Sequence, residues 1–177
     1  VWEANSNEYD DVLRALDGIV VREALSAEDL RRNHQIEARV CVDLSYFAEI
    51  ESSSCPDYSG QDVVSDFYSG EFQDFSRLTG GPLSKLPYID MSAMGWSELV
   101  CGLRTAGTFV TGRHHGVYAA CKARIPFIAL VGNTHKVDGL MVSAGSSIRC
   151  CRSLQQVVQQ RSAPIDHEEY GRLFAWM

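Results

Sequence analysis

The segment from Thr108 to Lys136, TFVTGRHHGVYAACKARIPFIALVGNTHK, constrains the fold more than any other part of this 177-residue chain. A short apolar run meets a glycine, an arginine and two histidines, and a stretch of small residues then leads to a second apolar run. This order is typical of a strand, a tight turn, a helix and the next parallel strand. It predicts strands at 108–111 and 126–131, a helix over 113–124 between them, and a further helix around 134–143.

The first fifty residues show the same alternation. EYDDVLRALDG predicts a short helix, GIVVRE a buried strand, LSAEDLRRN a helix with Ser26 as its N-cap, and ARVCVDLSYF the next strand. Helices that alternate with strands indicate an α/β fold, here a Rossmann-like parallel sheet flanked by helices. The length suits a single domain over residues 1–177.

The middle of the chain interrupts this alternation. Residues 51–84 are rich in Ser, Gly and Asp, which predicts a long loop region with limited structure. After it, LPYID predicts a short strand, GWSELVCGLRTAG a helix, SSIRC a weaker strand, and RSLQQVVQQ and DHEEYGRLFAW two closing helices.

Charge and cysteine content narrow the class of protein. A net charge of −7 argues against a general nucleic-acid partner, because no basic stripe is available for phosphates. No apolar run approaches the roughly 18–20 residues that would cross a bilayer. The six cysteines include no CxxC pair, so we expect neither a disulfide framework nor a metal site, and the simplest compartment is the reducing cytoplasm. The sequence leaves the oligomeric state open, a homo-oligomer included.

Polar side chains follow each predicted strand. Arg22 and Glu23 follow the first, Asp43 and Ser45 the second, and the runs GRHHG and GNTHK the strands at 108–111 and 126–131. Since ligands of open parallel sheets bind outside the carboxyl ends of the strands, we expect these loops to form one rim.

The GRHHG run contains the groups that an anion site needs. Gly112 permits a tight turn, and Gly116 lets the new helix pack closely against the sheet. The free N–H groups at the helix start and the helix dipole favour an anion. Arg113 can grip a carboxylate or a phosphate, and His115 can exchange a proton with it.

Each cation also has an ordinary structural interpretation. Arg22 can pair with Glu23 or Asp29 on the surface, and Lys136 can be a solvated helix residue. Two neighbouring histidines cannot both point inward, so we expect His114 to be solvated. His34 and His167 are expected on the surface.

Together these segments resemble a known family. FVTGRHHGVYAACKARIPFIALVGNTHKVDGLM is similar to the signature of the polysaccharide pyruvyl transferases, in which a strand leads to R-x-H-G, a small-residue helix, another strand and a loop with lysine. Upstream, LRALDGIVVREALSAEDLRR followed by ARVCVDLSYF looks like the family's R-E/D-x-x-S helix and its next strand, which ends in Asp. The resemblance covers residues 10–47 and 96–141.

The resemblance implies a fold similar to the two-lobed GT-B glycosyltransferases. This chain is similar to the carboxyl-terminal half and the segment that leads into it. Because it starts at Val1 and has no amino-terminal Rossmann half, we expect a fragment. The implied reaction moves a pyruvyl group from phosphoenolpyruvate to a sugar of a cell-surface polysaccharide. The partners would be that donor and a glycan or lipid-linked sugar acceptor, with no metal or other cofactor required.

The same resemblance assigns roles to residues. His115 matches the family's histidine and is the expected general acid/base, Arg113 and Arg22 would bind the donor's anionic groups, and Lys136 would contact phosphate. The remaining expected substrate-binding residues are Gly112, Gly116, Asn133 and Thr134. His114 occupies the variable position of R-x-H-G and stays outside the catalytic set, and no role follows for His135.

Two alternatives remain open from the sequence. A GT-B glycosyltransferase or sugar-nucleotide epimerase would use the same rim for a nucleotide diphosphate. A half-domain without catalytic activity would serve as a glycan-binding or assembly module.

Overall fold

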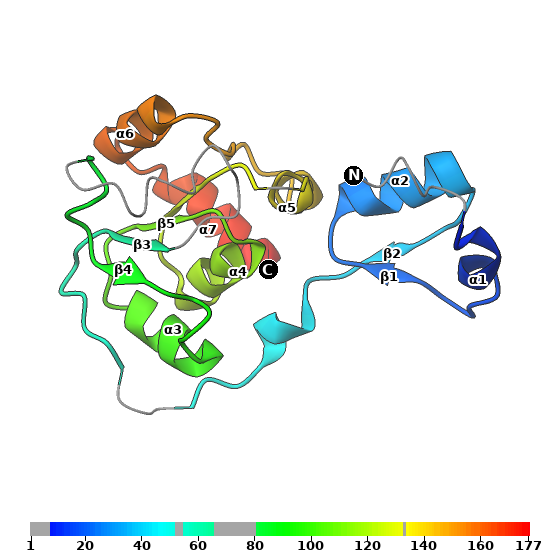
Figure 1. Cartoon of the computed structure of the whole chain (residues 1–177), viewed down its shortest axis with the longest axis horizontal. Helices are drawn as coiled ribbons and strands as arrows, with labels where there is room; N and C mark the ends of the chain where they lie inside the picture. Colours follow the sequence, from blue (N-terminus) through cyan, green and yellow to red (C-terminus); the bar gives the residue numbers. More distant parts are fainter. Residues whose placement is uncertain (1–7, 52–54, 66–80, 133) are drawn as a thin grey trace.

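Two separate parallel sheets, both flanked by helices, make up the α/β structure in the computed structural model, which describes residues 8–51, 55–65, 81–132 and 134–177 (Figure 1). The predicted fold class, a parallel sheet architecture with helices on its faces, is confirmed. The helices predicted at 113–124, around 134–143 and near the end of the chain are also present.

The smaller sheet contains only two short strands. β1 (Val20–Val21) pairs in parallel with β2 (Arg39–Val40), and the helices α1 (Asp10–Arg14) and α2 (Ala24–His34) accompany them. After β2 the chain forms a 3₁₀ helix, η2 (Leu44–Phe47), where the sequence predicted that the strand continues. The strands at GIVVRE and ARVCVDLSYF therefore exist, but they belong to a sheet of their own rather than to the main sheet.

The main sheet has the strand order β4-β3-β5-β6. Its strands are β3 (Val63–Ser65), β4 (Tyr88–Ile89), β5 (Phe109–Thr111) and β6 (Phe127–Ala129). β3 lies inside residues 51–84, so the prediction of a loop with limited structure is wrong there. Three residues, VVS, are too short a run for a periodicity signal, and their complete burial comes from the neighbouring strands β4 and β5. Residues 52–54 and 66–80 of the same prediction lie outside the described part of the chain.

Side chains alternate between two hydrophobic clusters, one on each face of the main sheet. Phe109 and Phe127 join the larger cluster, which also takes residues from α3 (Trp96–Leu103), α4 (His114–Ala123), α5 (Lys136–Ser143) and α7 (His167–Trp176). Val110 and Ile128 join the smaller cluster under α6 (Leu154–Ser162). This period of two, buried on both faces, is what a parallel sheet covered by helices requires. The prediction of a weak strand at SSIRC, residues 146–150, is wrong, and the next residue, Cys151, forms a single bridge with Leu130.

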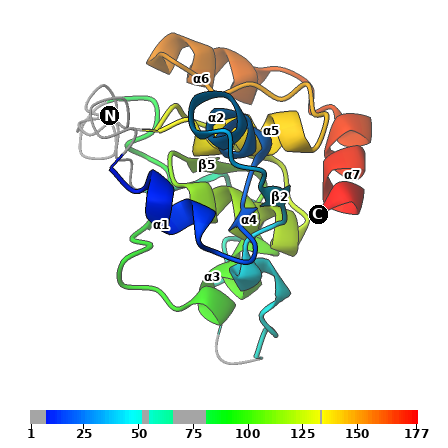
Figure 2. The ribbon, with the colours of Figure 1, turned by 90° about the vertical axis from the view of Figure 1, so that its right-hand side faces the viewer.

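The small sheet is tied to the main one through the contact of α2 with α5, which lie side by side in Figure 2. Glu23 is buried, and its carboxylate accepts hydrogen bonds from the backbone N–H groups of Leu25 and Ser26. Glu23 is thus the N-cap of α2, and the prediction that Ser26 is the cap is wrong. Only a glycine fits at Gly139 of α5, since a Cβ there would overlap the Glu23 carboxylate.

His34 was expected on the surface, and this expectation is wrong. Its side chain is buried, with Nδ1 at 2.5 Å from Oδ1 of Asp10, so it joins α2 to α1. Arg14 completes the cluster by donating to Asp10 at 3.0 Å. His167 is exposed, as predicted.

One disulfide bond corrects the interpretation of the cysteines. Cys55 and Cys101 are bonded, with their Cα atoms 5.6 Å apart, and they fasten the segment before β3 to α3. Cysteine spacing did not predict this pair, because the two cysteines are 46 positions apart in the sequence. Disulfides persist in oxidising compartments, so the argument for a reducing cytoplasm loses its basis.

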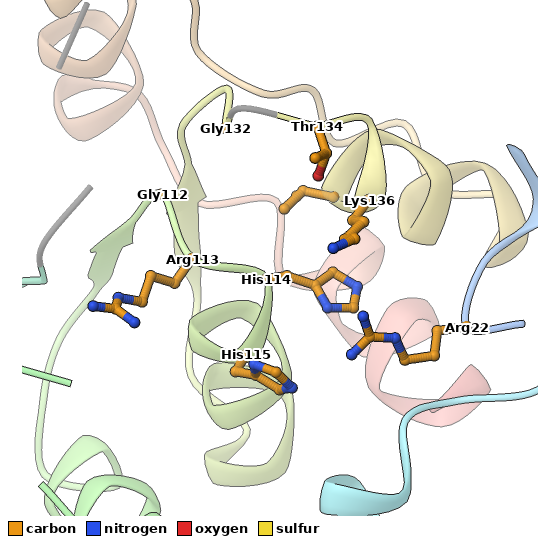
Figure 3. A pocket seen from close by; sticks show the side chains of 9 residues that line it. Arg22, Gly112, Arg113, His114, His115, Gly132, Thr134 and Lys136 are labelled. Carbon is orange, nitrogen blue, oxygen red and sulfur yellow. The ribbon is translucent and has the colours of Figure 1, made fainter. Parts of the chain in front are cut away.

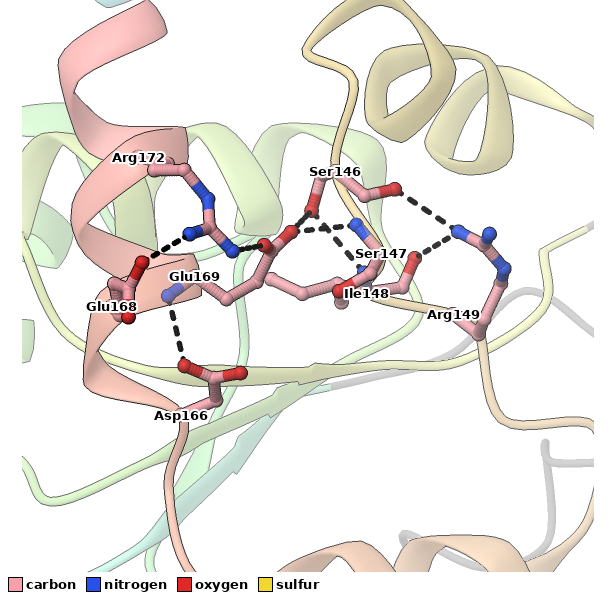
Figure 4. Close-up of polar contacts among 8 residues, drawn as sticks. All are labelled: Ser146, Ser147, Ile148, Arg149, Asp166, Glu168, Glu169 and Arg172. Carbon is pink, nitrogen blue, oxygen red and sulfur yellow. Dashed lines mark hydrogen bonds and ion pairs between the residues drawn. The ribbon is translucent and has the colours of Figure 1, made fainter.

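A polar network holds the last helix against the chain segment that precedes α6 (Figure 4). Asp166 caps α7 by accepting from the N–H of Glu169 at 2.9 Å. The buried Glu169 carboxylate accepts from the hydroxyl of Ser146 and the N–H of Ser147, each at 2.6 Å, and also pairs with Arg172. These hydrogen bonds lower the pKa of Glu169 to about 2. None of the described helices is long and apolar enough to cross a membrane.

Candidate functional site

A pocket of about 170 Å³ lies where β1, β5 and β6 end (Figure 3). Its wall consists of Arg22, residues 112–115, Gly132 and residues 134, 136 and 137. A second hollow of about 230 Å³ shares Arg22 and Lys136 with it. The two sheets therefore bring together three of the predicted loops, although these loops do not belong to one sheet.

The turn between β5 and α4 is fixed by Thr111. Its buried Oγ1 accepts a hydrogen bond from the hydroxyl of Ser65 at 2.8 Å and another from the backbone N–H of Arg113 at 3.1 Å. Gly116 packs directly on the Thr111 side chain, where a Cβ would overlap the hydroxyl. The predicted reason for Gly116, close approach of the helix to the sheet, is thus confirmed. α4 begins at His114, so its first turn faces the pocket.

The structure buries the ring nitrogens of His114 and exposes the side chain of His115, which reverses the prediction. His114 was expected to be solvated, but both of its ring nitrogens are buried, and neither has a hydrogen-bond partner in the described part of the chain. Burial and the nearby positive charges of Arg22, His115 and Lys136 lower the pKa of His114 to about 4, against the opposing effect of Asp43. His115, the expected acid/base, has an exposed side chain, and its Nε2 lies 3.5 Å from Oδ2 of Asp43.

Helical periodicity contained the signal that separates these two histidines. Positions three, four and seven residues after His114 are Val117, Tyr118 and Cys121, all completely buried. For His115 the equivalent positions are Tyr118 and Ala119, which are also completely buried, and Lys122, which is only partly buried, so the seventh position alone separates the two histidines. The family motif pointed to the second histidine, whereas the apolar face of α4 indicates that the first one turns inward.

Arg22 is held by Asp43, which follows β2. Its Nη1 donates to Oδ2 of Asp43 at 2.5 Å. Burial would raise the pKa of Asp43, but the hydrogen bonds from Arg22 and Ser45 outweigh it and hold that pKa well below its usual range. The backbone N–H of Asp43 donates to the Tyr118 hydroxyl of α4 at 3.2 Å. Asp43 therefore connects the small sheet to the helix that bears both histidines.

Sequence reasoning placed Asp43 at the rim but did not include it among the site residues. Its position directly after a predicted strand and two residues before Ser45 was the available signal, since an aspartate there commonly accepts from the amide two residues on. The Ser45 N–H does donate to Oδ1 of Asp43, at 3.0 Å. Contact with Arg22 and His115, far away in sequence, could not be read from this pattern.

Arg113 and Lys136 lie on different sides of the pocket. Figure 3 shows Lys136 and Arg22 reaching toward the His114 ring, while the Arg113 guanidinium points to the other side of the β5–α4 turn. On that side, hydrogen bonds from Ser92 and then the charge of Arg113 contribute to lowering the pKa of Asp90. Arg113 is thus separated from the other two cations by the turn itself.

The GNTHK loop is described except at Asn133, so the prediction for Asn133 lies outside the described residues. Gly132 and Thr134 line the pocket, as does Lys136 at the start of α5. Nε2 of His135 lies 3.4 Å from Oε1 of the buried Glu23 and 3.3 Å from the Ser26 hydroxyl, which places it beside the pocket.

No group of three or more His, Cys, Asp or Glu side chains in the described ranges is arranged to hold a metal ion. The positive charge of the site comes from Arg22, Arg113, Lys136 and the amino terminus of α4, a ten-residue helix. Helix termini and basic side chains of this kind favour a small anion.

Comparisons with known proteins do not assign a family. No family model and no curated protein matches the chain. Among solved structures, it is similar to a chain described as "Crystal Structure Analysis of the Glycotransferase of kitacinnamycin", with a TM-score of 0.43 and 14% identity. The alignment covers 73% of this chain and 42% of that one. A similarity of this strength says nothing about substrate or activity.

Proposed function

We propose that this chain carries the donor site of a pyruvyl transferase-like enzyme, which moves a pyruvyl group from phosphoenolpyruvate to a hydroxyl of a polysaccharide sugar. The main support is the convergence of Arg22, Lys136 and the amino terminus of α4 on one small pocket. Phosphoenolpyruvate combines a phosphate and a carboxylate in a few atoms, and both groups match these cations.

Pocket size favours this donor over a sugar nucleotide. Sites for drug-sized ligands usually measure about 300–1,000 Å³. The pocket has about 170 Å³, which suits a small anion, whereas a nucleotide diphosphate would also have to extend into the adjoining hollow of about 230 Å³ that shares Arg22 and Lys136.

The residues around the pocket have different roles in the proposed reaction. Arg22 and Lys136 bind the phosphate and stabilise its departure, as a preorganised positive field does for developing negative charge. The free N–H groups at the amino terminus of α4 bind the donor's carboxylate, whereas Arg113, whose guanidinium points to the other side of the turn (Figure 3), does not contact the donor. His115 protonates the methylene carbon of the enol phosphate, which makes C2 electrophilic, and then takes the proton of the first sugar hydroxyl as that oxygen bonds to C2. Phosphate leaves as its C2–O bond breaks, and a second sugar hydroxyl bonds to C2 and releases its proton, which closes the ketal. Asp43 orients His115 and holds Arg22 in place.

Thermal denaturation with added ligands tests the donor. Phosphoenolpyruvate at millimolar concentration is expected to raise the melting temperature, and uridine diphosphate is not, because ligands that bind only the folded chain stabilise it. The Lys136→Met variant should lose this stabilisation, whereas Lys85→Met, which changes an exposed lysine away from the pocket, should keep it.

The alternative outcomes assign the alternative functions. Stabilisation by uridine diphosphate alone would favour a glycosyltransferase or epimerase. Stabilisation by neither ligand would favour a non-catalytic glycan-binding or assembly module. In transfer assays with a saccharide acceptor, His115→Ala should lower the rate about 10²-fold or more, as loss of a general acid does.

A further inference from the structure

The ring nitrogens of His114 have no role in the proposed reaction. Nδ1 and Nε2 are both buried, and neither makes a hydrogen bond within the described residues. Buried polar atoms in folded proteins nearly always have a partner, so each exception needs a physical reason. Of the side chains with this property, His114 is the one that lines the pocket.

Packing fixes the orientation of the ring. The His114 ring meets the Tyr118 ring edge-on, with ring centroids 4.8 Å apart and planes at 76°. The centroid of the His115 ring lies 5.8 Å from that of His114. In Figure 3 the His114 ring lies between Lys136 on one side and Arg22 on the other. A ligand that bridges these two cations therefore lies beside the ring, and it reaches a ring nitrogen once the side chains that cover that nitrogen shift.

The surroundings of His114 disfavour a positive charge on the ring when no anion is bound. Burial is the largest cause, and the adjacent cations add to it, so the ring is neutral at pH 7. The charged and titratable groups that face it from the packed elements are Arg22, Asp43, His115, Tyr118 and Lys136. Asp43 alone favours the charged form, and its carboxylate is already engaged by Arg22.

An anion between Arg22 and Lys136 would reverse this balance. Its negative charge offsets the two cations, and opposite charges within about 4–6 Å favour the charged form of a titrating group. The protonated ring has two N–H donors, so it can also supply a hydrogen bond to an anion oxygen. The ring nitrogens would then gain the partner that the structure does not give them.

We propose that His114 takes up a proton from solvent when a phosphate-like anion binds between Arg22 and Lys136, and that the resulting imidazolium donates a hydrogen bond to that anion. The inference rests on the proposed function only for its expectation that the donor's phosphate occupies this pocket. It makes His114 a binding residue for the anion, distinct from the acid/base role proposed for His115. Binding and protonation are then coupled, so anion affinity rises as the pH falls.

Calorimetric titration with inorganic sulfate tests the coupling. Sulfate does not change its protonation between pH 6 and 8.5, so every proton taken up must reside on the protein. Titrations in two buffers of different ionisation enthalpy give the number of protons taken up per anion. We expect uptake to rise from near zero at pH 8.5 toward about one proton at pH 6.

Matched variants assign the proton to a residue. His114→Gln should abolish the uptake, and His115→Gln should retain it. Binding of sulfate without proton uptake, or uptake lost in His115→Gln and retained in His114→Gln, would overturn the inference, as would the absence of any sulfate binding. Should His114→Gln fail to fold, the ring ¹⁵N shifts of the unmodified chain report the same proton directly.

The same titration with phosphoenolpyruvate separates the two proposals. Proton uptake with sulfate but no binding of phosphoenolpyruvate would support the anion-linked proton and refute the proposed donor. Binding of phosphoenolpyruvate with a neutral His114 ring would leave the donor in place and overturn the role of His114.

Discussion

Replacing Asp43 by Asn tests whether the ion pair between its carboxylate and Arg22 stabilises the chain. Asparagine has nearly the same size, but it lacks the charge that Arg22 binds at 2.5 Å. A hydrogen bond that involves a charged group contributes about 1.5–3 kcal/mol. Because the Arg22 side chain is 39% exposed, solvent screening reduces the expected loss to about 1–2 kcal/mol. For a domain of this length, that corresponds to a decrease in melting temperature of about 2–8 °C.

The pH dependence of this loss has a definite sign. The pKa of Asp43 is lower in the folded chain than its ordinary value of 3.8, so the stabilisation is fully present above that value and is lost as the pH falls below it. Urea denaturation should therefore give a constant difference in unfolding free energy between the two proteins from pH 5 to 8. The difference should shrink below about pH 4, where Asp43 takes up a proton in the unfolded chain while it stays ionised in the folded chain.

Asp57 provides the matched control for this experiment. It accepts from the N–H of Ser59 at 2.9 Å, the same two-residue turn that Asp43 makes with Ser45, but it is exposed and forms no ion pair in the described part of the chain. Asp57→Asn should change the unfolding free energy by less than about 0.5 kcal/mol. Equal effects of the two substitutions, or an Asp43→Asn effect that does not weaken at low pH, would refute the ion-pair explanation.

Two further predictions concern the packing and the covalent link. Gly139→Ala should destabilise the chain in thermal denaturation, because the new Cβ meets the buried carboxylate of Glu23. Gly171→Ala in α7 is the control: its Cβ meets no atom within 4 Å, so this substitution should be neutral or stabilising by up to about 1 kcal/mol. Cys101→Ser should lower the unfolding free energy by about 2–4 kcal/mol, since the bond to Cys55 closes a loop across 46 residues. A denaturation curve that does not change when a reductant is added would show that the bond is absent.

The sequence predicts the main sheet well where a strand is followed by a long helix. The segment from Thr108 to Lys136 carries both periodicities, and β5, α4 and β6 appear where these place them. The prediction from sequence fails at β3, whose three residues are buried only because β4 and β5 flank them. Such burial depends on pairing between segments far apart in the chain, which no local pattern contains.

The residues of the candidate site also differ in whether a local sequence pattern predicts them. Residues of the β5–α4 turn could be predicted, because glycine, arginine and histidine at a helix start have local consequences. Asp43 and the inward orientation of His114 depend on how the small sheet lies against α4, through the bonds from Asp43 to Arg22 and to Tyr118. The neighbouring Glu23 illustrates the limit, since its burial beside Gly139 brings together residues more than a hundred positions apart.

A crystal structure of the chain with phosphoenolpyruvate would show whether the pocket between Arg22 and Lys136 holds the donor. We expect a phosphate oxygen within hydrogen-bond distance of the Lys136 ammonium and the Arg22 guanidinium, with a His114 ring nitrogen on the same group. Phosphoenolpyruvate bound elsewhere on the chain, with none of these three side chains contacting it, would contradict the claim that this pocket is the donor site.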